Sequence, residues 1–355
     1  MTLHTRLCGL LGIEHPVINA PMGGGDAPAA LAAAVSEAGG LGLIGGTTFG
    51  GAGWLRDEIR RARSLTDRPF GVGFISHIPG ASDLMALALE EGVRVIAHSF
   101  ADPTPFVPAA HDAGAIVLCQ VRSVAEARVA AAAGADVITA QGTEAGGHTG
   151  RVSTLPLVPA VVDAVAPVPV VAAGGIADGR GIAAALLLGA EGVWIGTRFV
   201  ATPESGVGSA SKARLVTAAG DQTVLTDVFD LVLGMPWPEG VSGRALRNRF
   251  VERWHGREDD LRAWAEEHRS EYLALGPDVD VEERPVWAGE VVSLVDELEP
   301  AADVVRRLVA ERRIAFHHVG RHVRFSLSDL DAWLVASRVE PLTLEMIWRD
   351  LHGAA

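Results

Sequence analysis

Cysteine, aromatic residues and long apolar runs are all scarce in this sequence of 355 residues. The two cysteines, Cys8 and Cys119, are too few and too far apart for a disulfide framework or a structural zinc site. No apolar run approaches the roughly 20 residues of a membrane span, and the apolar stretch near the start is too short and too broken for a secretory signal. These absences predict a cytoplasmic protein that does not bind membranes.

Positive charge is also scarce: the chain has 30 Lys and Arg but 44 Asp and Glu, which gives a net charge of −14. A surface of this sign disfavours broad, nonspecific binding to nucleic acid or to an anionic membrane. Small apolar residues are abundant instead, and the hydrophobic residues make up 48% of the chain. Such a composition is typical of an α/β protein in which small-residue helices cover parallel strands.

Short runs rich in Val and Ile alternate with Ala-rich segments of helical spacing. The eight runs span residues 16–20, 41–45, 70–75, 93–100, 115–121, 136–142, 168–175 and 192–197. Several intervening segments end in Gly, as helices often do. Eight such alternations within about 200 residues predict a TIM barrel, the (β/α)₈ fold.

The alternation stops after the eighth run, which divides the chain into three predicted regions. Residues 1–200 together with 287–311 form the barrel, and its last helix lies within 288–311. Residues 201–286 are rich in charge and Trp and show no clear strand, so we expect a helical insertion. Because barrel active sites lie at the carboxyl ends of the strands, this insertion is placed to cover the site. Residues 312–355 form a C-terminal extension.

Glycine-containing turns end the seventh and eighth predicted strands, at Gly174-Gly175 and Gly196-Thr197. Glycine lets backbone amides approach an anion closely, and the start of a helix adds unpaired N–H groups. Barrels commonly bind phosphate at these two turns. Either pair alone could merely close a tight turn, but both together favour a phosphate site.

The segment QGTEAGGHTG, residues 141–150, places His148 in a glycine-flanked loop after the sixth predicted strand. A loop histidine is usually solvated, but this one should face the same end of the barrel as the phosphate turns. Its imidazole could remove a proton from carbon or stabilise an anion near neutral pH. His148 is therefore the candidate catalytic residue.

Four segments together resemble the nitronate monooxygenase family: PVINAPMGGG near the start, QGTEAGGHTG, VVAAGGIADGRG and GTRFVATPES. The resemblance covers about residues 5–311 and implies a barrel that binds FMN beneath a small helical domain. It implies that the FMN phosphate lies at the two glycine turns and that His148 binds the nitro group or takes the α-proton. It further implies that the flavin contacts Ala20, Pro21, Met22, Gln120, Gln141 and Gly146.

The activity that this resemblance implies is oxidation of a nitronate or nitroalkane by O2 to a carbonyl compound and nitrite. Two departures weaken the substrate inference. Gly73, in the predicted flavin surface, stands where many relatives have Asn, and the turn HSFADP replaces a glycine-containing turn. His98 in that turn could contribute to the pocket or be a buried hydrogen-bonding residue. Glu204 and Ser205 match a family pair and could equally cap a helix.

The basic segment 306–324 holds six Arg and one Glu and resembles half of an excisionase-type winged helix-turn-helix. In such domains the helix and hairpin contact phosphates and a groove. The same helix should complete the barrel, so DNA binding is the less favoured interpretation and a structural or homo-oligomerising tail the preferred one. His317, His318 and His322 lie among these arginines, which disfavours a cation, and we predict no metal site.

Other functions remain open at this stage. An FMN-dependent NAD(P)H reductase of the quinone or enoyl-thioester type would use the same phosphate turns without a separate nucleotide motif. A flavin-bearing DNA-binding regulator rests on the basic tail alone. An inosinate-dehydrogenase-like enzyme would need a nucleophilic cysteine at the barrel mouth, and Cys119 falls inside a predicted strand instead.

Overall fold

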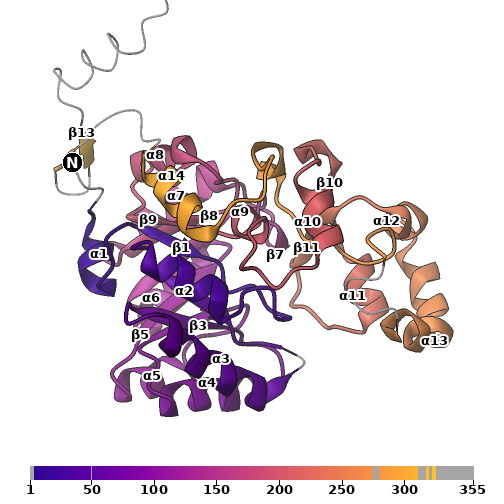
Figure 1. Cartoon of the computed structure of the whole chain (residues 1–355), viewed down its shortest axis with the longest axis horizontal. Coiled ribbons are helices and arrows are strands. Elements are labelled where there is room, and N and C mark those ends of the chain that lie inside the picture. The colour runs from indigo at the N-terminus through magenta and orange to yellow at the C-terminus, as the bar shows by residue number, and fades with distance from the viewer. Residues whose placement is uncertain (1–3, 49, 275–279, 311–316, 320–321, 325–355) are drawn as a thin grey trace, which may run out of the picture. The chain divides into compact units, whose positions relative to one another are not determined.

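The computed structural model describes residues 4–48, 50–274, 280–310, 317–319 and 322–324. Chain contacts divide it into two compact units, Met1–Glu311 and Arg312–Ala355. The first unit contains the barrel and the insertion, and Figure 1 shows the insertion helices α11 to α13 beyond one end of the barrel. None of the helices in the described residues is long and apolar enough to cross a membrane.

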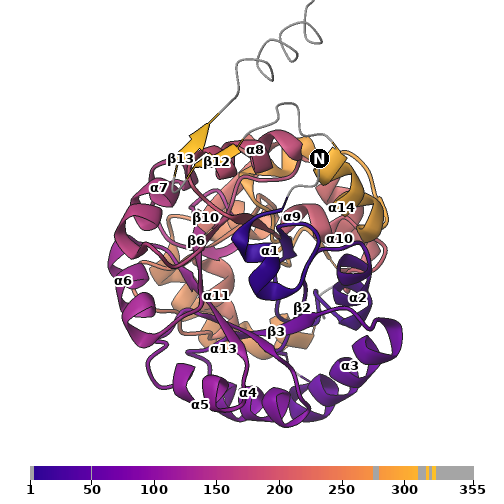
Figure 2. The same ribbon diagram turned by 90° about the vertical axis from the view of Figure 1, so that its left-hand side faces the viewer.

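The predicted barrel is confirmed, with one parallel strand in each of the eight apolar runs. Its sheet has the order β1-β9-β8-β6-β5-β4-β3-β2, and a bridge between Ile18 and Leu41 links its two ends. Figure 2 shows the helices as a ring around these strands. The strands are β1 (Val17–Asn19), β2 (Gly42–Gly45), β3 (Phe70–Ile75), β4 (Val95–Ser99), β5 (Ile116–Val121), β6 (Val137–Gln141), β8 (Val170–Ala173) and β9 (Gly192–Ile195).

The ring of helices follows the predicted Ala-rich segments. It comprises α2 (Ala29–Glu37), α3 (Gly51–Leu65), α4 (Ala81–Glu90), α5 (Val107–Asp112), α6 (Val124–Ala133), α7 (Thr154–Val165) and α8 (Gly179–Leu187). A short helix, α1 (Arg6–Leu11), crosses the amino-terminal end of the barrel in Figure 2. Its Leu7 and Leu11 share one buried cluster with Leu118 and Trp194, so α1 closes that end. The opposite end is therefore the open one.

The last barrel helix is shorter than predicted. Within 288–311 the chain first forms a single 3₁₀ segment, η2 (Glu290–Leu294), and then α14 (Ala301–Ala310). Pro300 directly precedes α14, a position where proline suits the start of a helix. Glu204 Oε2 accepts a hydrogen bond of 3.1 Å from the Ala301 N–H, which is the predicted capping role. The helix packs against α2 and α8, and Val304, Val305 and Leu308 are buried.

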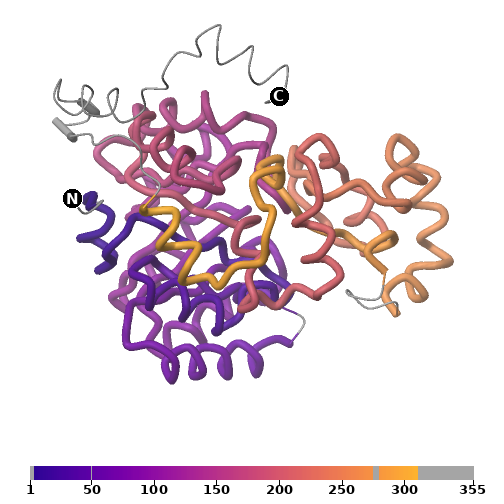
Figure 3. The backbone as a smooth tube through the Cα atoms, turned by 45° about the horizontal axis from the view of Figure 1, so that its top comes forward, coloured from indigo at the N-terminus to yellow at the C-terminus, as the bar shows by residue number. Residues whose placement is uncertain are grey.

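The insertion is not purely helical, and in that respect the sequence prediction was wrong. Besides α10 (Ser209–Leu215), η1 (Gly220–Gln222), α11 (Val228–Leu233), α12 (Arg249–Trp254) and α13 (Glu258–Ala274), it contains strands β10 (Thr223–Thr226) and β11 (Ser242–Leu246). A third strand, β7 (Gly147–Thr149), comes from the barrel and pairs with β11. A short helix, α9 (Thr197–Val200), leads from β9 toward the insertion. Figure 3 follows this path of the chain from the barrel and back.

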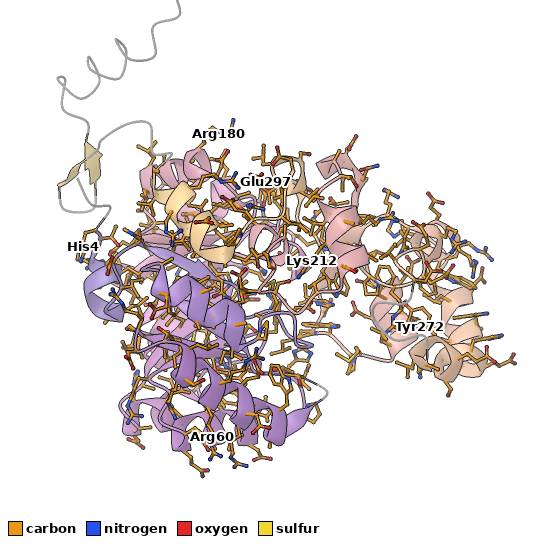
Figure 4. The ribbon with its side chains drawn as sticks, viewed as in Figure 1. His4, Arg60, Arg180, Lys212, Tyr272 and Glu297 are labelled. Atoms are coloured by element: carbon orange, nitrogen blue, oxygen red, sulfur yellow. The ribbon has the colours of Figure 1, made fainter. Side chains whose placement is uncertain are left out.

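The insertion has a core of its own. Phe229, Phe250, Trp254 and Tyr272 are buried in one aromatic cluster, which differs sharply in composition from the Ala- and Val-rich barrel. Lys212 lies where insertion and barrel meet (Figure 4), and its Nζ donates a hydrogen bond of 2.9 Å to the Ser205 carbonyl. This buried polar contact ties α10 to the first residues of the insertion.

In the second unit, β12 (His317–Val319) pairs antiparallel with β13 (His322–Arg324). This is the position of the hairpin predicted for the winged element. The helix predicted to follow it lies outside the described residues. The arginine-bearing helix predicted to precede it is α14, whose apolar face is buried in the barrel. The resemblance to a DNA-binding domain therefore lacks a free recognition helix within the part of the chain that the structure describes.

Candidate active site

The two phosphate turns lie side by side, because β8 and β9 are neighbours in the barrel. Gly174 and Gly175 have φ angles of 96° and 72°, values that favour glycine. A Cβ added to Gly174 would lie 3.0 Å from the Gly142 carbonyl oxygen and from Thr154 Oγ1. Only glycine therefore fits at this position, and the backbone is left open toward the barrel mouth.

Thr197, in the second turn, is nearly buried at 7% exposure. Its Oγ1 accepts a hydrogen bond of 2.9 Å from the Gly289 N–H. A hydroxyl that accepts one hydrogen bond still has its own hydrogen to donate to an anion. Gly196 and Thr197 together with Gly174 and Gly175 thus fit the phosphate-binding role predicted for them.

The Ala20-Pro21-Met22 turn crosses the carboxyl ends of β1 to β3. A Cβ on Gly45 would overlap the Met22 carbonyl, and a Cβ on Gly73 would overlap the Pro21 ring. At Gly73 the proline ring of this chain fills the space that a side chain would need. The turn therefore packs directly against Gly45 and Gly73, and its backbone lies along the open end of the barrel.

Gln120 and Gln141 end the neighbouring strands β5 and β6, and the Gln120 amide donates a 2.8 Å hydrogen bond to Gln141 Oε1. The two side chains thus hold each other in place near the mouth, and their contact with a flavin stays a prediction. Gly146 lies next to Gly289 instead. A Cβ at position 146 would be only 2.6 Å from the Gly289 nitrogen. Close packing of the segment returning from the insertion requires glycine at 146, and its contact with a flavin stays a prediction.

His148 is not in a flexible loop but in β7, where it stands opposite Gly243 of β11. Its Nε2 lies 2.9 Å and 3.0 Å from the two carboxylate oxygens of Asp230 in α11. A carboxylate accepts hydrogen bonds, so Nε2 carries the hydrogen and, in the neutral ring, Nδ1 keeps the lone pair. Both side chains are mostly buried, with exposures of 13% for His148 and 9% for Asp230.

Aromatic rings surround this histidine. The Trp237 ring stacks on the imidazole with a centroid distance of 3.4 Å, and Trp287 lies 5.0 Å away at a tilt. Trp237 also contacts His77 at 4.7 Å and Phe100 at 5.0 Å. The pair of His148 and Asp230 is therefore shielded from water on the side of the insertion.

Sequence reasoning missed Asp230, Trp237 and His77. Asp230 lies in the helical segment VFDLVL, 82 residues from His148, and no local spacing relates the two. The sequence did contain a sign of Trp237's role, because this residue lies between two prolines in the segment MPWPEG. An isolated large aromatic in a proline-rich loop of an insertion expected to cover the site is a reasonable candidate for contact with it.

His98 and Cys119 are structural. His98 is 3% exposed, its Nε2 contacts the Ala101 carbonyl at 3.1 Å, and burial lowers its pKa. Burial also raises the pKa of the Cys119 thiol to about 12, so it is no ready nucleophile. This removes the residue that an inosinate-dehydrogenase-like reaction would need. Within the described residues, no three His, Cys, Asp or Glu side chains group as a metal site.

Comparison with known proteins identifies the family. Residues 4–311 match the family described as nitronate monooxygenase. The chain belongs to the nitronate monooxygenase family. It is accordingly a flavin-dependent oxidoreductase with a TIM barrel, as the resemblance implied. The match ends at the boundary between the two compact units.

The proteins to which this chain is similar carry different names. A Mycobacterium tuberculosis protein named (3aS,4S,5R,7aS)-5-hydroxy-7a-methyl-1-oxo-octahydro-1H-indene-4-carboxyl-CoA dehydrogenase is 43% identical over 71% of this chain and 69% of its own. A Pseudomonas aeruginosa nitronate monooxygenase is 36% identical, and the match covers 87% of this chain and 99% of that protein. The solved structure of FabK from Thermotoga maritima has 39% identity and a TM-score of 0.79, covering 87% of this chain and 96% of FabK.

Proposed function

We propose that this protein binds FMN at the open end of its barrel and oxidises alkyl nitronates or nitroalkanes, with O2 as the electron acceptor. Gly174, Gly175, Gly196 and Thr197 would hold the phosphate, and the Ala20-Pro21-Met22 turn with Gln120 and Gln141 would line the ring. Bound FMN would accept an electron from the nitronate, and O2 would complete its conversion. The turn at Gly174, where a Cβ would lie 3.0 Å from two oxygen atoms, supports this assignment.

His148 would act on the substrate carbon that carries the nitro group. A neutral nitroalkane must lose its α-proton before oxidation, and the Nδ1 lone pair is the basic atom that the contact with Asp230 leaves on the ring. With a nitronate, which has already lost that proton, the ring would hold the anion only as an imidazolium, with a hydrogen on Nδ1 to donate. Asp230 holds the imidazole in one tautomer, and Trp237 excludes water from its face.

The observation that carries the proposal is the hydrogen-bonded pair of His148 and Asp230, placed by the pairing of β7 with β11 at the same end of the barrel as the phosphate turns. A glycine-flanked histidine without such a partner could be an ordinary surface residue. A histidine whose orientation is fixed by a buried carboxylate and a stacked indole is organised for proton transfer or anion binding.

The test is an anaerobic titration of the purified protein, followed by its visible spectrum, first with propyl nitronate and then with NADH. Bleaching of the flavin bands by the nitronate and not by NADH is the expected result. Bleaching by NADH alone would contradict the proposal and favour a reductase. A spectrum without flavin bands, even after incubation with added FMN, would contradict the cofactor assignment itself.

A second candidate is oxidation or reduction next to the carbonyl of an acyl-CoA thioester. The specific support is the 43% identity to the dehydrogenase from Mycobacterium tuberculosis, whose name describes a carboxyl-CoA substrate. A thioester, like a nitro group, acidifies the hydrogen on the adjacent carbon, so His148 could serve either reaction. Bleaching of the flavin by an acyl-CoA but not by the nitronate would favour this candidate.

A further inference from the structure

A cleft of about 390 Å³ opens between the loop that follows β4 and helix α6. Its floor is the outer surface of the barrel, where His98, Cys119 and Val121 line it. One wall is the loop 100–103, and the other is the face of α6 that carries Ala125, Val129 and Ala130. We call this feature the α5–α6 cleft, after the helices whose connections border it.

The α5–α6 cleft is apolar along most of its length, although it is open to solvent. Val129 is 47% exposed, one of the more exposed large apolar side chains in the described residues. Three charged side chains line the cleft: Arg122 pairs with Glu126 at 2.6 Å, and Asp102 accepts hydrogen bonds from Thr104. Its volume lies within the roughly 300–1,000 Å³ of ordinary ligand sites. Such a cleft suits a chain of methylene groups better than a charged group.

The inner end of the α5–α6 cleft reaches the candidate active site. Gln120, Phe100 and Pro238 line it there. Gln120 is hydrogen-bonded to Gln141 in the predicted flavin surface, and Pro238 is covalently bonded to Trp237, the residue stacked on His148. A molecule reacting beside His148 could therefore extend its remainder directly into the cleft.

Phe100 at this junction has a strained backbone. Its φ angle is 63°, and it is the one non-glycine residue with positive φ in the described part of the chain. A bulky residue in this conformation persists only where its surroundings hold it, and such strain concentrates at binding sites. Here the ring stands edge-on to Trp237 at 5.0 Å and beneath the Arg122 guanidinium at 5.5 Å. The contacts with Trp237 and Arg122 hold the ring at the lining of the cleft.

We propose that the α5–α6 cleft is the subsite for an unbranched alkyl chain attached to the reacting carbon, and that Phe100 and Val129 select substrates by the length of that chain. This rests on the proposed function for the reacting end of the substrate, and it defines the substrate class further as medium-chain rather than short. The cleft residues do not contact the reacting atoms, so they act on binding and not on proton transfer.

The test measures binding of propanoate and octanoate to the FMN-loaded protein by calorimetry. A carboxylate resembles a nitronate in shape and charge but is not oxidised, so binding is separated from turnover. Because each buried methylene favours binding, we expect octanoate to bind at least tenfold more tightly than propanoate. The substitution Val129→Trp, which fills the cleft, should reduce this preference below threefold.

Two controls accompany that substitution. Val129→Thr keeps the volume of the side chain and should keep the preference for octanoate. Leu187→Trp places the same indole at another exposed apolar position, 48% exposed at the end of α8 and absent from the cleft lining, and should also keep it. If the Val129→Trp chain does not fold, Phe100→Gly replaces it, because glycine accepts the positive φ and removes the inner wall. That variant should lose at least threefold of the preference.

Two results would overturn the inference: equal binding of both carboxylates to the unaltered protein, or an unchanged preference in the variants that alter the cleft. The proposed function is tested separately by nitronate turnover in the same preparations. Turnover of propyl nitronate without any preference for octanoate contradicts the cleft alone. Preference for octanoate without nitronate turnover contradicts the reaction and leaves the cleft assigned to an alkyl carboxylate or thioester.

Discussion

The barrel and the insertion contribute to the site in different ways. The barrel offers mainly backbone, in turns that leave no room for a side chain, as at Gly174 and Gly73. The insertion offers side chains: Asp230 contacts Nε2 of His148, and Trp237 stacks on its ring. The difference teaches that the proposed cofactor binding and the proposed proton transfer would depend on separate parts of the chain, which can be altered separately.

His148→Ala should produce the largest effect and the clearest separation of the two regions. Flavin content should stay unchanged because the phosphate turns are intact. Turnover of a neutral nitroalkane should fall by about 10²–10⁴-fold, the usual cost of losing a general base. Flavin absorbance and oxygen uptake measure the two quantities. His111→Ala is the matched control, since His111 also contacts an aspartate, at 3.0 Å from Asp136, but on the outside of the barrel.

Asp230→Asn should be the next largest effect. An amide can donate or accept, so it no longer requires hydrogen on Nε2. Turnover of a nitroalkane should fall by about 10- to 100-fold, below the loss from removing the base itself, and Asp230→Glu should restore part of it. ¹⁵N NMR of the neutral histidine should show a single tautomer in the unaltered protein and a mixture in the variant. An unchanged tautomer would reduce Asp230 to a packing residue, and Asp136→Asn controls for the substitution.

Gly73→Ala should affect the barrel and leave the insertion untouched. The added Cβ would overlap the Pro21 ring, so the turn along the mouth must shift. We expect a loss of about 1–3 kcal/mol in the free energy of unfolding, as for other overpacked core positions, together with weaker flavin binding. Urea unfolding and flavin release on dilution measure these changes. Gly9→Ala is the control, because a Cβ there meets nothing within 4 Å. Full retention of flavin would show that the turn does not contact it.

Truncation after residue 311 should have the smallest effect. The family match and the first compact unit both end there, so flavin content and turnover should stay within about twofold of the full chain, a change under roughly 0.5 kcal/mol. The DNA-binding alternative predicts instead that the tail is required for binding to duplex DNA. A shift of duplex DNA at low salt that disappears on truncation would revive it.

The sequence was sufficient to predict the barrel because each strand and its turn carry a local pattern. Short Val- and Ile-rich runs predicted the strands, and the glycines at their ends predicted the turns that stay candidates for phosphate binding. The strands β10 and β11 were not predicted because TVLT and SGRAL are short and show no clear alternation of apolar and polar residues. Asp230 was missed for another reason. The fold brings α11 next to β7, although the two are far apart in the sequence, and only this contact pairs Asp230 with His148. Residues paired through tertiary structure carry no spacing that a single sequence reveals.

The pairing of His148 with Gly243 has an evolutionary consequence. The contact between β7 and β11 uses backbone hydrogen bonds, which hardly depend on the identity of the side chains in β11. The insertion can therefore accumulate substitutions around the pocket while the histidine keeps its place, as long as position 243 stays small enough for Trp287. A scaffold of this kind lets the lining of the pocket change without moving the candidate catalytic histidine.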